Sequence, residues 1–426
     1  MFYAVLQRLV RIIYRIYFRR IYFHNAEVVP SDKPVLLACN HPSAAVEPAL
    51  IGLYMPHQIY YITRGDIADK PKLLWFFEAT NQIPIYRFRD GFSNLKKNMD
   101  SFAFVFKKLA ANKTIIIFAE GLCIQEKKLR PLQKGLGKMA FGAFEDNQVR
   151  DTLVIPVCVN FSAVNTFRSD VQASFGTPIP IEKYLETYQE QPNRALRLLT
   201  DETQHAMKEL IVHIERNSDE PYVDQLTEIA FHNAGLELAA GKYLSDTRLQ
   251  REIKIANRFN ALDDEEREQI MPLIDKYKES LNAHKLKDEI VQAQGQFAIW
   301  KILPALLLLP VAAWAWITNQ IPFRVSRSMA EKLPKTIEFY PSIRIFSFIF
   351  FALVQFLILT PILVICCGWY GLLIALSIPI TGYWLMPYWE MCLQIIRSLR
   401  YRNLNKQEQA NLSNLRADIQ QKFPLN

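Results

Sequence analysis

The chain has 426 residues, of which 50% are apolar and 22% charged, and its 50 Lys and Arg against 42 Asp and Glu give a formal net charge of +8. This composition excludes a disordered chain. A wholly soluble protein is also excluded, because residues 345–387 are almost entirely apolar whereas charges recur every few residues from 182 to 289. The six cysteines form no CxxC pair and no cluster with histidine, so we expect no metal site and no disulfide framework, which favours a cytosol-facing compartment.

Residues 1–24 are predicted to form a basic amphipathic helix on a membrane surface. Most of their arginines recur at three- and four-residue steps, and no acidic residue precedes Glu27. A cationic, aromatic-rich helix of this kind suits an anionic lipid surface. The alternative is a helix that packs on its own domain. A signal peptide is not expected, because charges interrupt every apolar run.

Residues 25–215 are predicted to form an α/β domain with a mostly parallel sheet and flanking helices. Short apolar runs rich in β-branched residues alternate with helical stretches, as parallel sheets require. The expected strands are 34–39, 58–62, 81–86, 114–118 and 153–161. The expected helices are 44–54, 73–79, 91–111 and 135–144.

Residues 216–296 are predicted to be a charged helical insertion with a hairpin near 262–265, and the pattern assigns it no chemistry. Residues 297–395 hold three apolar segments. Segments 345–366 and 369–387 are long enough, at about 1.5 Å per residue, to cross about 30 Å of hydrocarbon. Segment 302–318 contains two prolines and is predicted to be shallow or re-entrant.

The positive charges set the expected orientation. The loop before residue 345 and the tail 396–426 are both basic, so a two-span hairpin keeps them on the cytosolic side together with the α/β domain. The sequence therefore predicts an integral membrane protein with its catalytic domain on the cytosolic face, at the cytoplasmic membrane if the chain is bacterial.

The strongest motif is an apolar run that ends in Asn40-His41-Pro42, with Glu47 further on. A histidine with a nearby carboxylate can act as an oriented general base. Six residues rotate a regular helix by about 600°, so His41 and Glu47 would not share a helical face. We therefore expect at least one of them outside regular helix, and Pro42 favours this.

Four ordered blocks resemble the glycerolipid acyltransferases, the superfamily of lysophosphatidate and glycerol-3-phosphate acyltransferases. They are Asn40-His41 with Glu47, Ile83-Pro84-Ile85-Tyr86-Arg87, Phe118-Ala119-Glu120-Gly121 and Val154-Ile155-Pro156-Val157. The usual pattern leaves four residues between the histidine and an aspartate, whereas here five residues precede a glutamate. The residues after Gly121 also depart from the pattern, since Leu122 and Cys123 replace a threonine and an arginine.

The resemblance implies catalysis by His41, oriented by Glu47. It implies an acceptor site with a phosphate ligand, and a proline block that shapes the acyl-donor site. The residues expected to bind substrate are Asn40, Arg87, Glu120, Gly121, Lys134 and Pro156. The donor is expected to be acyl-CoA or acyl carrier protein.

We thus expect a membrane O-acyltransferase of phospholipid biosynthesis that acylates lysophosphatidate or glycerol-3-phosphate, with membrane lipids as partners. Transfer from a thioester requires no metal or cofactor, only a base and suitably placed donors in a water-poor site. The alternatives are acylation of a lyso-aminolipid, a lipid-binding pseudoenzyme, or a hydrolase. Nucleic acid is not expected as a partner, since the basic residues accompany an apolar face and no binding motif.

Overall fold

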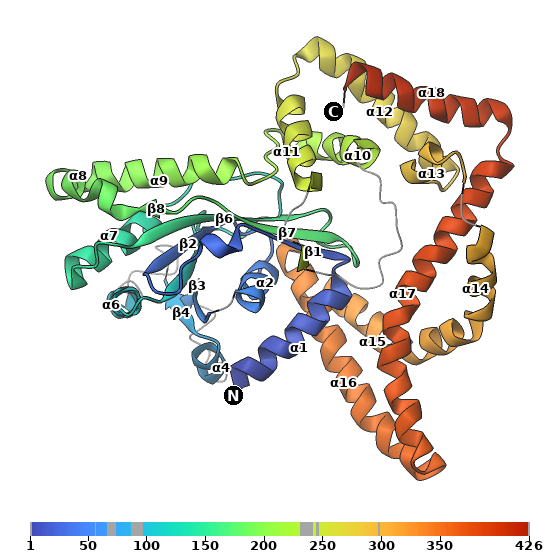
Figure 1. Cartoon of the computed structure of the whole chain (residues 1–426), viewed down its shortest axis with the longest axis horizontal. Coiled ribbons are helices and arrows are strands. Elements are labelled where there is room, and N and C mark those ends of the chain that lie inside the picture. The colour runs from blue at the N-terminus through green and yellow to red at the C-terminus, as the bar shows by residue number, and fades with distance from the viewer. Residues whose placement is uncertain are drawn as a thin grey trace. The chain divides into compact units, whose positions relative to one another are not determined.

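The computed structural model describes residues 2–55, 57–65, 74–86, 97–230, 242–243, 247–296 and 299–424. The chain divides into two compact units (Figure 1). The sheet unit comprises Met1–Val212, Gly241–Asp246 and Lys335–Ser342, and the helical unit comprises His213–Ala240, Thr247–Pro334 and Ile343–Asn426.

The sheet unit is built on one mostly parallel sheet, which confirms the predicted α/β class. The described strands are β1 (Arg20–His24), β2 (Val35–Cys39), β3 (Ile59–Arg64), β4 (Gln82–Ile85), β5 (Thr114–Phe118), β6 (Leu153–Phe161), β7 (Asp170–Phe175), β8 (Ile179–Pro180) and β9 (Lys242–Tyr243). Their order is β4-β3-β5-β2-β6-β7-β1-β9, and β8 pairs with β6. Among the described strands, only the β6–β7 and β6–β8 pairs are antiparallel.

Helices flank this sheet because its central strands bury side chains on both faces. They are α2 (Val46–Tyr54), α4 (Leu74–Ala79), α6 (Lys97–Ala110), α7 (Gly135–Asn147), α8 (Leu185–Glu190) and α9 (Pro192–Lys208). In β2, Leu36 and Ala38 join a core with residues of α6, α7 and α9. Leu37 and Cys39, which alternate with them, are also fully buried and face the opposite side.

The N-terminal segment differs from the prediction, because helix α1 (Phe2–Tyr17) ends well before residue 24. Residues Arg20–His24 instead form β1, parallel to β7. The physical reason is a distant partner: the buried carboxylate of Asp170 lies 3.2 Å from Arg19 and 3.9 Å from Arg20. The arginines therefore anchor the end of a strand and do not continue the helix.

Helix α1 itself has one packed and one exposed face. Tyr14 is fully buried, and its hydroxyl donates to the carbonyl of Val46 in α2 at 3.0 Å. Leu9 and Ile12 are exposed on the other side, beside the exposed Arg8 and Arg15. The helix thus packs on its own domain and still presents an apolar, cationic surface.

The helical unit joins the insertion to the C-terminal segment. Its helices outside the apolar region are α10 (Glu220–Ala230), α11 (Thr247–Asn260), α12 (Asp264–Ala283), α13 (Asp288–Gln292) and α18 (Lys406–Lys422). The chain turns from α11 to α12 at residues 261–263, where the hairpin was expected, and a capping box of Asp263 and Glu266 begins α12. Arg416 of α18 pairs with the buried Asp288 at 2.9 Å. The segment predicted as a basic tail is therefore a folded helix.

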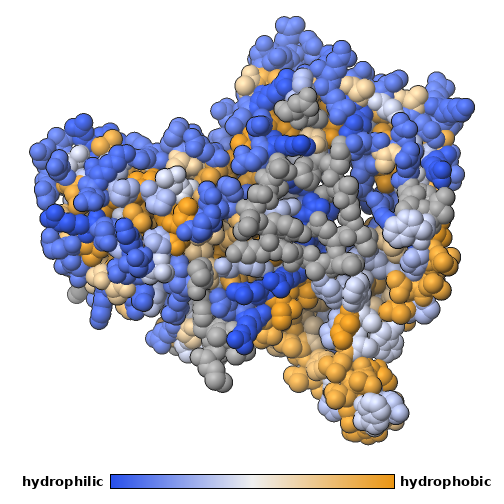
Figure 2. All heavy atoms as spheres, in the orientation of Figure 1, coloured by the Kyte–Doolittle hydropathy of each residue, from blue (hydrophilic) through white to orange (hydrophobic). Residues whose placement is uncertain are grey.

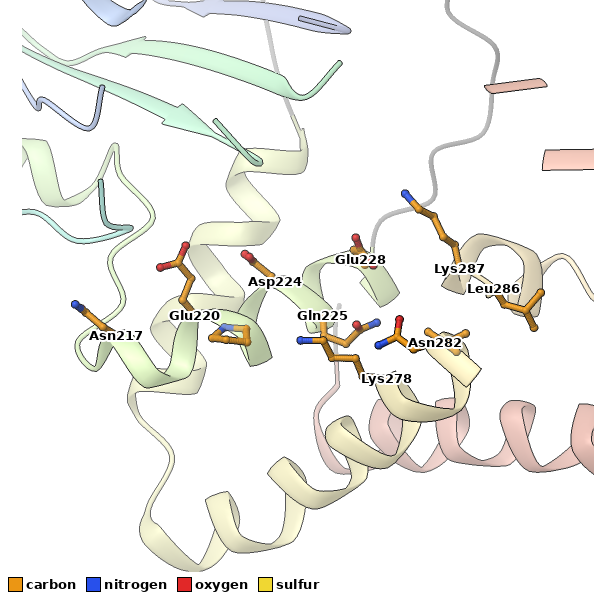
Figure 3. Close-up of a pocket in the computed structure, with 11 residues that line it drawn as sticks. Asn217, Glu220, Asp224, Gln225, Glu228, Lys278, Asn282, Leu286 and Lys287 are labelled. Atoms are coloured by element: carbon orange, nitrogen blue, oxygen red, sulfur yellow. The ribbon is translucent and has the colours of Figure 1, made fainter. Parts of the chain in front are cut away.

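A cavity of about 520 Å³ lies within the helical unit (Figure 3). Glu220, Asp224 and Glu228 of α10 contribute acidic groups, and Lys278 and Lys287 contribute basic ones. None of the residues that line it belongs to the four sequence blocks. The cavity is thus separate in sequence from the predicted site.

Four apolar helices follow: α14 (Ile302–Leu307), α15 (Leu309–Lys332), α16 (Tyr340–Cys367) and α17 (Tyr370–Asn403). They belong to the helical unit except for the first three residues of α16. Among the described residues, Ile337–Cys367 and Tyr370–Asn403 are long and apolar enough to span a membrane. Leu357 is 69% exposed, and apolar side chains gather around the turn between α16 and α17 (Figure 2). Such exposure is unfavourable in water.

Polar side chains in this apolar region hydrogen-bond between helices. Gln355 of α16 donates to the carbonyl of Thr318 in α15 at 2.6 Å, and Trp314 donates to the hydroxyl of Ser377 at 3.1 Å. Polar groups in a hydrocarbon environment need partners of this kind. The helices α15, α16 and α17 are thus linked by contacts that suit a lipid environment. Short 3-10 helices lie at Ala26–Val28, Ile181–Tyr184, Asn217–Asp219, Ile299–Lys301 and Ile337–Phe339.

Candidate active site

The candidate site lies at the carboxyl edge of the parallel sheet. His41 follows the end of β2, Glu120 follows the end of β5, and Arg64 is the last residue of β3. Because these strands are mutually parallel, their carboxyl ends meet at one edge. Open α/β sheets bind ligands at this edge.

His41 and Glu47 form a hydrogen-bonded pair between Nδ1 and Oε1. The side chain of His41 is 17% exposed and that of Glu47 is completely buried. His41 precedes helix α2, and Glu47 lies in its first turn. The pair therefore forms as the spacing required, with the histidine outside regular helix.

Two further contacts fix this pair. The backbone N–H of Ser43 also donates to Oε1 of Glu47, at 3.1 Å. The imidazole stacks on Phe118, with ring centroids 3.9 Å apart and planes inclined by 20°. With Nδ1 bound to Glu47, Nε2 is the nitrogen that can exchange a proton with a substrate.

The Glu120 carboxylate binds the backbone of two different loops. Its carboxylate accepts from the N–H of His41 at 3.3 Å and from the N–H of Arg130 at 3.0 Å. Burial raises the pKa of this carboxyl, although the two backbone donors oppose the shift. Glu120 therefore holds the His41 backbone against the loop that follows β5.

Gly121 makes the turn that follows Glu120. Its φ is +68°, and an added Cβ would lie 3.0 Å from Cγ of Gln133. Its N–H donates to the carbonyl of Phe118 at 3.0 Å. A left-handed residue with so little room favours glycine.

Asn40 and Pro156 contribute to the support of the site. The side-chain amide of Asn40 donates to the carbonyl of Val159 at 3.0 Å and accepts from its N–H at 2.8 Å. Pro156 is buried in β6, opposite Ala38 of β2. These contacts fix the end of β2, from which His41 projects.

Of the two basic residues predicted to bind substrate, the structure describes only Lys134, which is exposed directly before α7. Arg87 lies outside the described residues. Arg64 is a site residue that the sequence analysis missed, although a basic residue at the end of an apolar run could have suggested it. Glu338 also reaches the site, since its carboxylate accepts from the N–H of Gln125 at 3.3 Å.

The nearby thiol and hydroxyl groups are poorly suited to act as nucleophiles. Burial raises the pKa of the Cys123 thiol, and the carboxylates of Glu47 and Glu338 raise it further. Burial likewise raises the pKa of Cys39. Ser43 Oγ is fully buried and has no hydrogen-bond partner among the residues that the structure describes. A protonated thiol and an unactivated hydroxyl both react slowly.

Comparison with known proteins identifies the class of this domain. Residues 20–160 match the family model described as Acyltransferase. Glycerol-3-phosphate O-acyltransferase 2 of Saccharomyces cerevisiae is 30% identical over 103 residues, which cover 24% of this chain and 14% of the yeast protein. Glycerol-3-phosphate O-acyltransferase 1 of the same yeast is 36% identical over 81 residues, 19% of this chain and 11% of that protein. This chain thus spans only a small part of both relatives.

A solved structure was also matched, that of the 1-acyl-sn-glycerophosphate acyltransferase from Thermotoga maritima. It has a TM-score of 0.31 and 16% identity, and the match covers 44% of this chain and 71% of that one. All four sequence blocks lie within residues 20–160, the range that matches the acyltransferase family model. The match therefore agrees with the resemblance of these blocks to the glycerolipid acyltransferases.

Proposed function

We propose that this protein transfers a fatty acyl group from an acyl-CoA or acyl carrier protein thioester to a hydroxyl of a phosphorylated glycerol precursor, either glycerol-3-phosphate or lysophosphatidate. The observation that carries the proposal is the buried His41–Glu47 pair at the carboxyl edge of the sheet. It lies inside the acyltransferase-family domain. The named relatives supply the acceptor class.

The chemistry follows from the two nitrogens of His41. Nε2 takes the proton of the acceptor hydroxyl while its oxygen attacks the thioester carbonyl carbon. Glu47 holds Nδ1 and stabilises the imidazolium that forms. The tetrahedral intermediate then expels the thiolate as the C–S bond breaks, and the imidazolium returns its proton to the sulfur. Direct transfer is favoured because Cys123 and Ser43 are poor nucleophiles in their surroundings.

In this proposal the phosphate of the acceptor binds to basic side chains near the carboxyl edge of the sheet. Arg64 ends β3, and the register pairs it with Ile85 of β4, two residues before Arg87. A guanidinium binds phosphate through charge-assisted hydrogen bonds, often bidentate. In this proposal Arg64 and Arg87 hold the phosphate and His41 meets the hydroxyl.

In this proposal two parts of the protein contact the membrane. The apolar helices α16 and α17 form a hairpin that spans the bilayer, with the turn at Gly368 on the side opposite the catalytic domain. The exposed Leu9 and Ile12 of α1, with Arg8 and Arg15, contact the anionic cytosolic leaflet. At this surface a soluble donor can meet lysophosphatidate in the membrane or glycerol-3-phosphate in solution.

An acceptor panel tests the proposal. Purified protein in detergent receives a radiolabelled acyl-CoA or acyl carrier protein together with glycerol-3-phosphate, lysophosphatidate, glycerol, monoacylglycerol or a lyso-aminolipid. We expect labelled product only with phosphorylated glycerol acceptors. Free fatty acid formed at the same rate without acceptor would identify a hydrolase, and transfer to the lyso-aminolipid alone would overturn the acceptor class.

A further inference from the structure

The loop between His41 and Glu47 is bound by a segment that lies almost 300 residues away in the chain. The N–H of Ala44 donates to the carbonyl of Glu338 at 3.1 Å. The N–H of Ala45 donates to the hydroxyl of Ser342 at 3.2 Å. Ala45 is the N-cap residue of α2 and has no side-chain cap of its own. We call residues 338–342 the strap.

The same strap reaches a second loop of the site. The carboxylate of Glu338 accepts from the N–H of Gln125, while the neighbouring N–H of Ile124 donates to the carbonyl of His41 at 3.1 Å. Glu338 therefore connects the two loops that enclose His41. Its backbone binds the loop before α2, and its side chain binds the loop after β5.

The contacts of the strap lie within the sheet unit. Glu338 is 9% exposed and Ser342 is 5% exposed, so both are buried. Lys335–Ser342 cluster with the sheet unit, although the residues on either side cluster with the helical unit. Ala44 and Ala45 are half-buried, and the strap supplies hydrogen-bond acceptors to their N–H groups. These two residues lie between the base His41 and Glu47, the acid that orients it.

We propose that the strap is a positioning element of the active site, in which Ser342 and Glu338 fix the His41–Glu47 loop in its catalytic geometry. This inference rests on the proposed acyl transfer. A misplacement of about 1 Å can reduce a rate by about a hundredfold. Because Ser342 lies in the first turn of α16, the strap also connects the His41–Glu47 loop to the start of the first of the two helices that are long enough to span a membrane.

The test is a substitution series in the full-length protein in detergent. Ser342→Ala removes the acceptor of the Ala45 N–H, and we expect kcat to fall about tenfold while KM for acyl-CoA and for glycerol-3-phosphate changes less than twofold. Ser342→Thr keeps the hydroxyl and restores kcat. Glu338→Ala lowers kcat similarly, whereas Glu338→Gln keeps an acceptor oxygen for Gln125 and loses less.

A matched control and a double mutant separate positioning from general destabilisation. Ser347→Ala makes the same change in the same helix, where the hydroxyl donates to the carbonyls of Ile343 and Arg344 within α16, and this variant should stay within twofold of wild type. If the strap acts through the His41–Glu47 pair, Ser342→Ala should cost less than threefold in a Glu47→Gln background. A full tenfold loss in that background, or the same loss in Ser347→Ala, would overturn the proposal.

The outcomes also distinguish this inference from the proposed function. An active wild type with an unaffected Ser342→Ala variant refutes the strap alone. A wild type that transfers no acyl group to any acceptor refutes the proposed function itself. Ser342→Ala is not used if it strongly lowers the melting temperature. In that case the activity of Glu338→Ala is compared with that of Glu338→Gln, and equal activities refute the strap.

Discussion

Replacement of Glu47 by glutamine isolates the charge of the acid that orients His41. Oε1 of Glu47 accepts from both the imidazole and the N–H of Ser43. The amide oxygen of glutamine can accept both bonds, so these contacts are kept and the negative charge is lost. The amide NH2 takes the place of Oε2, which is buried and has no hydrogen-bond partner among the described residues. The variant therefore measures how much the carboxylate stabilises the imidazolium that forms during transfer.

The expected magnitude follows from Coulomb's law. Two unit charges about 4 Å apart interact by about 4 kcal/mol at an effective dielectric constant of about 20. A change of about 1.4 kcal/mol in the barrier changes the rate about tenfold. The loss of about 4 kcal/mol would therefore lower the rate by close to three orders of magnitude. The imidazole side chain is 17% exposed, which weakens the interaction. We therefore expect a loss in kcat of about 10²- to 10³-fold.

The assay is steady-state transfer from labelled acyl-CoA, with both substrates varied. KM for the donor and the acceptor should change less than threefold, because Glu47 is completely buried behind His41. Glu186→Gln is the matched control, since Glu186 is an exposed acid in the first turn of α8. A kcat of Glu47→Gln within threefold of wild type would refute the idea that this carboxylate stabilises the imidazolium.

Three other predictions concern the phosphate, the buried acid and the membrane. Arg64→Ala should raise KM for glycerol-3-phosphate about ten- to a hundredfold, the equivalent of about 1.5–3 kcal/mol for a charged hydrogen bond, whereas the exposed Arg150→Ala should not; an unchanged KM excludes Arg64 from the phosphate site. Because burial raises the pKa of Glu120, the folded state binds this proton more tightly, and the resulting stabilisation is fully present below the unfolded pKa of about 4.3 and lost as the pH rises through the folded pKa. The melting temperature of wild type minus that of Glu120→Gln should therefore fall as the pH rises above about 4.3, and a rise would contradict the shift. The exposed Cys366 and Cys367 at the turn between α16 and α17 should react with an impermeant maleimide only from the membrane face opposite the catalytic domain, and labelling from the catalytic side would exclude a spanning hairpin.

The parts of the fold that sequence predicted correctly are those with strong local patterns. The run from Pro34 into His41 signals a buried strand and its end, and β2 ends at Cys39. Both β5 and β6 have the predicted bounds. A buried parallel strand is recognisable because it is apolar on both faces.

The features that sequence missed depend on distant partners. The arginine pattern of the N-terminal helix continues past Tyr17, and only pairing with β7 and Asp170 reveals a strand there. The C-terminal segment is predicted as a basic tail from its charges, yet its helix is held by partners far away in the chain, including the buried pair of Arg416 with Asp288. Charge patterns do not identify which charges are paired in the folded chain.

The candidate site shows the same division. His41 and Glu47 are close in sequence and carry a motif, and the structure pairs them. Glu338 lies in a loop whose composition indicated only a basic, cytosolic segment, and its role depends on a backbone contact with Ala44. No periodicity or spacing in the sequence encodes such a contact.

The most direct test of the central proposal compares His41→Ala with wild type in the acceptor-dependent transfer assay. Both proteins are purified in detergent, and their melting temperatures are compared to show that both are folded. Each then receives labelled acyl-CoA with and without glycerol-3-phosphate or lysophosphatidate. We expect wild type to form acceptor-dependent product and His41→Ala to lose at least about 10³-fold in kcat, since it lacks the base that Glu47 orients. Acceptor-dependent transfer by His41→Ala at a rate near that of wild type would contradict catalysis by His41.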